Sequence, residues 1–150
     1  NIIIDTGQNG IFCDERYTPG NGFRFINNTI INPGNDGIRL YAELVPMNVI
    51  ANNIIANPGS LGTHKGKRTD NDAFVYLLNS KVRVELSNNI FARTVEELRL
   101  VNPSSDNYRL SPDSPAINSG KDISQYKIEL DFYNQNRRRG PAFDIGASEH

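Results

Sequence analysis

One short pattern recurs along the first two-thirds of the chain: an asparagine, two or three apolar residues, a Gly-bearing turn and a second apolar run. The stretch "NIIIDTGQNGIF" from Asn1 aligns without a gap with "NTIINPGNDGIR" from Asn28, at an offset of 27 residues. A third copy begins at Asn53, 25 residues after Asn28, and a shorter fourth copy places Asn89 at the same position. A period this short indicates that each copy is a small unit that buries its apolar residues against its neighbours.

Each copy consists of short β-forming runs bounded by Gly, Pro and Asn, which is the pattern of strands joined by turns. The runs "FRFI", "MNVIA" and "VRVEL" precede a recurring Asn-Asn pair, whereas "TII", "IIA" and "IFA" follow it. No copy contains a convincing amphipathic helix, so leucine-rich and helical repeats are disfavoured. We therefore predict an all-β fold, a right-handed parallel β-helix of about three to four coils with an irregular C-terminal cap and at most one short helix.

In such a fold, equivalent residues of successive coils stack into columns. We expect two core columns and one asparagine column, which are Phe25 with Ile50 and Leu86, Ile30 with Ile55 and Phe91, and Asn28 with Asn53 and Asn89. The chain has 20 asparagines, and their type and spacing indicate a ladder of turn hydrogen bonds rather than a ligand site. The alternation in "GIRLY" directs Ile38 and Leu40 inward and Arg39 and Tyr41 outward.

The third copy is interrupted after its Pro-Gly turn. Asn35 aligns with Asn71 at an offset of 36 residues, which exceeds the offset of 25 by an 11-residue insertion, Ser60–Asp70. Loops that protrude from repeats gather on one face and often line the binding groove. The insertion is rich in basic side chains, which suit an acidic sugar; these are His64, Lys65, Lys67 and Arg68.

We predict that these four residues bind substrate together with Arg39 and Tyr41. The alternative is a solvated loop without a function, because many surface insertions have none. For His64 the sequence offers no identifiable partner carboxylate, so no catalytic residue is assigned. Cys13 is the single cysteine and lies in an apolar run, which indicates a buried small hydrophobe rather than a reactive thiol.

The repeat stops after about Ala92, so we predict coils over residues 1–92 and a C-terminal capping segment of the same domain over 93–150. In this segment "TVEELRLVN" is the best helix candidate, with Thr94 as N-cap and Glu97 as its capping-box partner. An end cap covers exposed strand edges and an apolar cross-section. The charged residues expected to pin it by ion pairs and turn bonds are Asp131, Arg137, Arg138, Asp144 and Glu149; a catalytic pair of Asp144 and Glu149 is the alternative.

The stretches "DNYRLSPDSPAINSG" and "DFYNQNRRRGPAFDIGASE" resemble the C-terminal end of secreted bacterial right-handed parallel β-helix proteins of the pectate-lyase-like superfamily. Asn118 stands where that ending usually has Asp, and Asn134 stands where Gly is usual. The matching residues are Tyr108, Arg109, Leu110, Ser114, Pro115, Ala116, Ile117, Gly120, Asp131, Arg137 and Asp144 through Glu149.

The superfamily includes polysaccharide lyases of the chondroitinase B and alginate lyase type as well as uncharacterised surface proteins. The resemblance implies a secreted, periplasmic or cell-surface protein, a polysaccharide lyase acting on an acidic, uronate-containing glycan. The alternative is a non-catalytic glycan-binding or adhesin-type module. In such lyases a Lys or Arg base and a cation, often Ca²⁺, act in central coils. The outward face here shows no acidic ladder, so we expect no cofactor in this chain and Ca²⁺ only in coils outside it.

Asn1 aligns with a turn residue inside a coil, so we expect the chain to begin partway round one. The missing N-terminal coils would then be a partner chain or a self-associating copy at the open end, and the isolated chain would lack a complete active site. Sixteen basic and seventeen acidic residues give a net charge of −1, which favours neither nucleic acid nor an anionic membrane as partner. No apolar run approaches the roughly 20 residues that span a bilayer.

Overall fold

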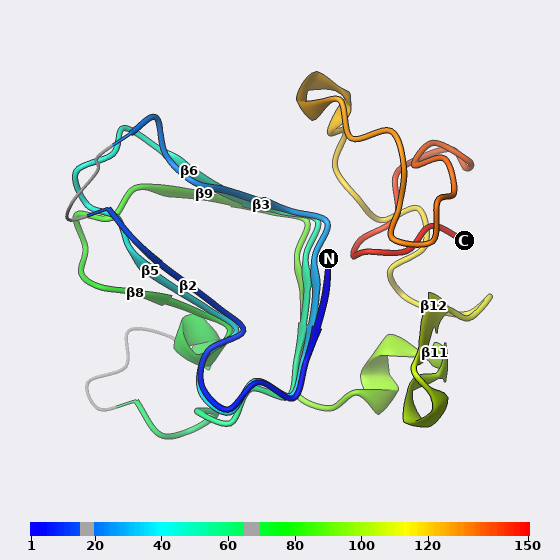
Figure 1. Cartoon of the computed structure of the whole chain (residues 1–150), viewed down its shortest axis with the longest axis horizontal. Helices are drawn as coiled ribbons and strands as arrows, with labels where there is room; N and C mark the ends of the chain where they lie inside the picture. Colours follow the sequence, from blue (N-terminus) through cyan, green and yellow to red (C-terminus); the bar gives the residue numbers. More distant parts are fainter. Residues whose placement is uncertain (16–19, 65–69) are drawn as a thin grey trace.

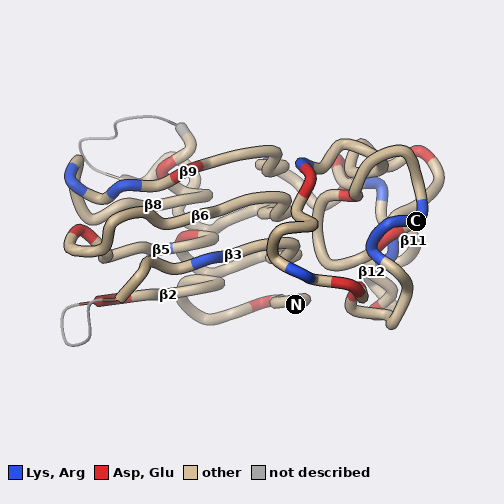
Figure 2. The backbone as a smooth tube through the Cα atoms, turned by 90° about the horizontal axis from the view of Figure 1, so that it is seen from above, with Lys and Arg blue, Asp and Glu red and all other residues tan. Residues whose placement is uncertain are grey.

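The computed structural model describes residues 1–15, 20–64 and 70–150. Its strands up to residue 92 form three parallel sheets that the chain visits in rotation. In Figure 1 the strands of each sheet overlap and the sheets form three sides of a coil, whereas Figure 2 shows the strands as stacked layers. The first sheet contains β1 (Ile2–Ile4), β4 (Thr29–Ile31), β7 (Ile54–Ala56) and β10 (Ile90–Ala92). The second contains β2 (Ile11–Asp14), β5 (Ile38–Tyr41) and β8 (Val75–Leu77), and the third β3 (Arg24–Ile26), β6 (Asn48–Ala51) and β9 (Val84–Ser87).

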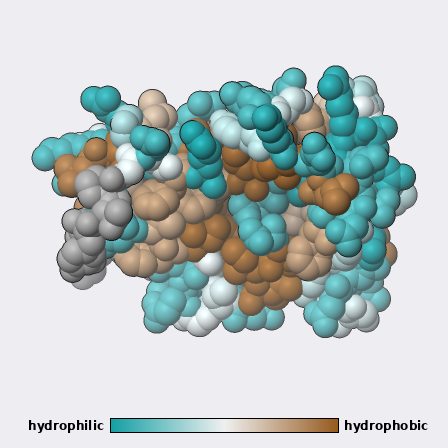
Figure 3. Space-filling view, turned by 45° about the horizontal axis from the view of Figure 1, so that its top comes forward, coloured by the Kyte–Doolittle hydropathy of each residue, from teal (hydrophilic) through white to brown (hydrophobic). Residues whose placement is uncertain are grey.

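The strand registers confirm an all-β chain and the residue pairing of both predicted columns, but the core position predicted for Leu86 is wrong. Ile30 is paired with Ile55, and Ile55 with Phe91, while Ile50 lies between Phe25 and Leu86. Ile30, Ile50 and Ile55 have no exposed surface, because a strand covers each of them on both sides. Leu86 is 47% exposed since β9 is an outer strand of its sheet. Figure 3 shows apolar residues reaching the surface in the middle of one face, among hydrophilic neighbours.

The asparagine column forms the predicted ladder. Asn1 Nδ2 donates to Asn28 Oδ1 at 2.9 Å, Asn28 Nδ2 to Asn53 Oδ1 at 2.9 Å, and Asn53 Nδ2 to Asn89 Oδ1 at 3.0 Å. The residue before each of the last three has a left-handed backbone, with φ of 53°, 54° and 48° at Asn27, Asn52 and Asn88. Asparagine tolerates this conformation better than most residues, which explains why the pairs recur.

The register of β8 corrects the sequence alignment. Ile38 is paired with Val75 and Arg39 with Tyr76, so the offset is 37 residues (75 − 38) rather than 36. The alignment matched Asn35 with Asn71, but Asn71 lies inside a 3₁₀ helix, η1 (Asp70–Ala73), which occupies the approach to the strand. On the outer side of β5 and β8 the neighbour of Arg39 is therefore Tyr76, whereas an offset of 36 would have placed Val75 there; Val75 points into the core and is 5% exposed.

The segment after β10 contains one antiparallel pair, β11 (Leu100–Asn102) and β12 (Asn107–Leu110), and short 3₁₀ helices. These are η2 (Glu96–Leu98), η3 (Pro103–Ser105) and η4 (Ser124–Tyr126). The described residues hold no α-helix. In place of the helix expected to begin at Thr94, the chain forms the 3₁₀ helix η2. Glu97 Oε1 accepts a hydrogen bond from the Thr94 N–H at 3.1 Å, as in a capping box, but Arg99 adopts a left-handed backbone and ends the turn.

The C-terminal segment packs along the outer face of the first sheet, beside the coils (Figure 1). Ile54, Ala56 and Ala92 form a second core there with Tyr108, Leu110, Ala116 and Ile145. This differs from the expected cap over the end of the stack, where Leu86 remains exposed. The reason lies in β4 and β7, whose residues are all buried and, apart from Thr29, apolar, because strands without an alternation of apolar and polar residues need cover on both faces.

Buried polar contacts fix this segment in place. Asn27 Nδ2 donates to the carbonyl oxygens of Asp144 and Gly146 at 3.1 and 2.9 Å. Arg137, which is 4% exposed, donates to the carbonyls of Gly146 and Ala147 at 2.8 and 3.1 Å and pairs with Glu149 at 3.4 Å. Among the described residues, no helix has the length and hydropathy that crossing a membrane requires.

Candidate functional site

Three of the six predicted substrate-binding residues lie together on the outer side of β5 and β8. Arg39 and Tyr41 project from β5, and His64 reaches the same place from the insertion. Lys65, Lys67 and Arg68 lie outside the described residues. The structure adds three residues that the sequence did not single out, Asp36, Ser60 and Tyr76, and we call these six the Asp36 cluster.

Asp36 is the centre of the cluster and has no exposed surface. Its Oδ1 accepts a hydrogen bond from Ser60 Oγ at 2.6 Å and lies 2.5 Å from His64 Nε2. Its Oδ2 lies 3.3 Å from Arg39 Nη1, within ion-pair distance but without hydrogen-bond geometry among the described residues. A carboxylate buried this deeply requires such partners, because burial of an unpaired charge is costly.

The turn before His64 carries the imidazole back over Asp36. Ser60 anchors this turn, since its carbonyl accepts hydrogen bonds from both the backbone N–H and the hydroxyl of Thr63, at 3.0 and 2.8 Å. The imidazole then stacks on Tyr76, with ring centroids 4.9 Å apart and an angle of 29° between the planes. Its side chain is 16% exposed, so the histidine reaches solvent while its carboxylate partner does not.

Three neighbours, Tyr41, Tyr76 and Asp36, hold the side chain of Arg39 in place. Its Nε donates to the Tyr41 hydroxyl at 3.1 Å, and its guanidinium carbon lies 4.4 Å from the centroid of the Tyr76 ring. Burial acts against the charged form, but the hydrogen bond to Tyr41 and the Asp36 carboxylate raise the pKa of Arg39 above its ordinary value. With 27% of the side chain exposed, the remaining N–H groups are available to a ligand.

The charges of the cluster favour an anion over a cation. Arg39 balances Asp36, and a protonated His64 would add a positive charge. Ca²⁺ takes six to eight oxygen ligands, whereas the buried oxygens of Asp36 already face Ser60, His64 and Arg39. Within the described ranges, no group of three or more His, Cys, Asp or Glu side chains is arranged to hold a metal ion. The residues of this face therefore do not fit a Ca²⁺ site.

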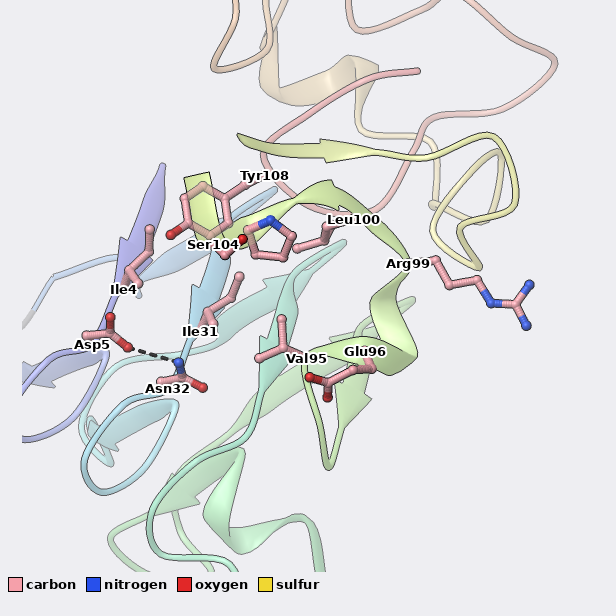
Figure 4. A pocket seen from close by; sticks show the side chains of 11 residues that line it. Ile4, Asp5, Ile31, Asn32, Val95, Glu96, Arg99, Leu100, Ser104 and Tyr108 are labelled. Atoms are coloured by element: carbon pink, nitrogen blue, oxygen red, sulfur yellow. Dashed lines mark hydrogen bonds between the residues drawn. The ribbon is translucent and has the colours of Figure 1, made fainter. Parts of the chain in front are cut away.

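A cavity of about 600 Å³ lies elsewhere, between the first sheet and the segment that covers it. Figure 4 shows Ile4, Ile31, Val95 and Leu100 on its walls, the Asp5–Asn32 hydrogen bond at its rim, and Arg99 pointing away. The Asp5–Asn32 bond, 2.9 Å long, belongs to a second turn ladder that Asn57 continues. None of the predicted site residues that the structure describes lines this cavity, which lies apart from the Asp36 cluster.

The missed residues had weak signals in the sequence. Asp36 occupies the position of Asn9 in the first copy, where Asn9 Oδ1 now accepts a hydrogen bond from the Asp36 N–H at 3.3 Å. The signal for Asp36 in the sequence was a carboxylate at a position where the preceding copy has a turn asparagine. Tyr76 was hidden by the one-residue error in the alignment of β8.

The chain matches no protein-family model, and comparisons with curated proteins and with solved structures found no match either.

Proposed function

We propose that this chain is part of a secreted, carbohydrate-active right-handed parallel β-helix protein that binds an acidic, uronate-containing glycan at the Asp36 cluster. Three parallel sheets visited in rotation, with columns of equivalent residues, support the β-helix. The resemblance of residues 106–149 to the ending of pectate-lyase-like proteins supports the polysaccharide-lyase class. A non-catalytic, adhesin-type module is the alternative.

The observation that carries the proposal is the fixed orientation of the Arg39 guanidinium. Asp36, Tyr41 and Tyr76 hold its guanidinium in one orientation at the surface of the coil. A planar guanidinium pairs with a carboxylate through two parallel N–H donors. An arginine that is already immobilised loses less conformational entropy when a ligand binds, so this position favours the carboxylate of a uronic acid over a neutral sugar.

Calorimetric titration with alginate, pectate and chondroitin oligosaccharides tests the proposal, with neutral oligosaccharides of equal length for comparison. Arg39→Gln removes the cation and is expected to raise the Kd of the acidic oligosaccharide at least about tenfold, because a charged hydrogen bond contributes about 1.5–3 kcal/mol.

Arg109→Gln is the matched control. Arg109 is exposed on β12 and its guanidinium carbon lies 3.7 Å from the centroid of the Tyr133 ring, so it reproduces the cation and the aromatic contact at another place. We expect no change in Kd for this variant. Equal losses in both variants, or equal affinity for acidic and neutral glycans, would remove the support for this site. Binding without cleavage would identify the adhesin-type alternative.

A further inference from the structure

The pair of His64 and Asp36 has the arrangement of a proton-transfer dyad. His64 Nε2 faces the carboxylate at 2.5 Å, and Ser60 donates to the same oxygen at 2.6 Å. An imidazole whose one nitrogen donates to a carboxylate presents the other as an unprotonated base. His64 Nδ1 has no hydrogen-bond partner among the residues that the structure describes. It is therefore the nitrogen that can take a proton from a bound molecule.

The neighbours of His64 indicate which proton of a bound molecule the imidazole removes. Arg39 lies over the Tyr76 ring, and His64 stacks on the same ring. A ligand whose carboxylate pairs with Arg39 therefore places the atoms next to that carboxylate near the imidazole. The hydrogen on the carbon that bears the carboxylate is the most acidic C–H of a uronic acid, and pairing with a cation increases its acidity.

We propose that His64 is the general base of this site, that Asp36 is its positioning residue, and that Tyr41 is the proton donor to the leaving group. The proposal rests on the proposed function, because it takes a uronate bound to Arg39 as substrate. It assigns the chemistry to residues of this chain, without the Lys or Arg base that the resemblance implied.

The reaction is an elimination in which all atoms are accounted for. His64 Nδ1 removes the proton from C5 of the uronate, and the C–H electron pair forms a C4–C5 double bond. The bond from C4 to the glycosidic oxygen breaks, and the leaving oxygen takes the proton of the Tyr41 hydroxyl. Tyr41 Oη already accepts a hydrogen bond from Arg39 Nε at 3.1 Å, so its own proton is free to be donated and the resulting phenolate lies beside a cation. Protons exchanged with solvent then restore both residues.

The expected product carries a double bond conjugated with its carboxylate, so its ultraviolet absorbance reports turnover. The full chain is incubated with alginate, pectate and chondroitin oligosaccharides, and the Kd of each is measured in parallel. His64→Gln keeps the size of the side chain but cannot accept the proton, so kcat is expected to fall about 10²- to 10⁴-fold. Its Kd for the oligosaccharide is expected to stay within twofold, which is about 0.4 kcal/mol.

His150→Gln changes the other histidine of the chain and is expected to leave both kcat and Kd unchanged. Binding by the wild-type chain without an unsaturated product at any pH overturns the elimination, leaves glycan binding at the Asp36 cluster intact and identifies the adhesin-type alternative. Turnover that survives in His64→Gln shows that the base is another residue. Absence of both binding and turnover rejects the proposed function together with the inference.

Asp36→Asn tests the positioning role, with circular dichroism to establish the folded fraction. The titratable groups facing His64 among the described residues are Asp36, Arg39 and Tyr76 from the second sheet and its turn. Loss of the carboxylate removes the acceptor that orients His64 Nε2, so kcat is expected to fall by a larger factor than the Kd for the oligosaccharide rises. Equal factors in kcat and Kd, at an unchanged folded fraction, would mean that Asp36 acts only on the structure of the site, which contradicts its assigned role.

Discussion

Asn28 is bonded to Asn53 twice, since its backbone N–H and its side-chain Nδ2 both donate to Asn53 Oδ1, at 3.0 and 2.9 Å. Asn53 is fully buried and donates in turn to the Phe25 carbonyl at 2.8 Å. Asn53→Ala therefore leaves a buried backbone N–H without its acceptor. We expect the free energy of unfolding to fall by about 2–4 kcal/mol, as measured by denaturant titration.

Asn35→Ala provides the control for that substitution. Asn35 Nδ2 donates to Gln8 Oε1 at 2.7 Å across the same two coils as the Asn1–Asn28 bond, but the pair is exposed to water. The expected loss is below about 1 kcal/mol, because water replaces the missing partner. If both variants lost the same free energy, burial would not be the reason for the strength of the ladder.

Gly37 fits only because it lacks a side chain. A Cβ at this position would collide with Ile55 Cγ2 and lie 2.6 Å from the Phe74 carbonyl oxygen. Gly37→Ala is expected to lower the free energy of unfolding by about 1–3 kcal/mol through overpacking, measured by thermal and denaturant unfolding. Gly7→Ala is the comparison, since nothing lies within 4 Å of its added Cβ, and should stay within about 0.5 kcal/mol. An equal effect at both positions would contradict the packing explanation.

The features that sequence predicted correctly are those governed by local repetition. The columns of Ile30 and Asn28 follow from strand alternation and turn chemistry, which are visible within one copy and its neighbour. Arg39 and Tyr41 were placed outward for the same reason, and the structure leaves their role in substrate binding as a prediction.

The remaining features depend on contacts that no single copy contains. The carboxylate partner of His64 is 28 residues away in the preceding coil, and its identity requires the path of the insertion. The register of β8 was wrong by one residue because η1 absorbs part of the insertion. The position of residues 93–150 beside the first sheet follows from which face remains apolar, and "TII" and "IIA" carried that signal through their lack of alternation.

Arg137 is expected to be essential for the attachment of the C-terminal segment. It is 4% exposed, and it donates to the carbonyls of Gly146 and Ala147, the first of which also accepts a hydrogen bond from Asn27 Nδ2. Arg137→Ala leaves Glu149 and these carbonyls without the cation, with an expected loss of about 3–5 kcal/mol in the free energy of unfolding. Arg138→Ala removes an exposed neighbour and should cost less than about 0.5 kcal/mol. Similar losses in both would contradict the buried contact.

Glu149 makes the stability of this segment depend on pH. Burial, and next the nearby Asp144 carboxylate, raise the pKa of Glu149 from 4.5 to about 7, although Arg137 acts in the opposite direction. Between these two values the folded chain holds this proton more firmly than the unfolded chain does. The free energy of unfolding contributed by Glu149 is therefore fully present below about pH 4.5 and is lost as the pH rises through 7.

Glu149→Gln removes this titration and keeps an uncharged side chain of the same size beside Arg137. We expect the wild-type chain to lose stability relative to the variant as the pH rises from 5 to 8, in denaturant titrations of both proteins at each pH, because only the wild type must release a proton. Glu96→Gln, at an exposed position of η2, controls for the removal of one carboxylate and should give a constant difference. A constant difference for Glu149→Gln as well would show that Glu149 is ionised alike in the folded and unfolded chains.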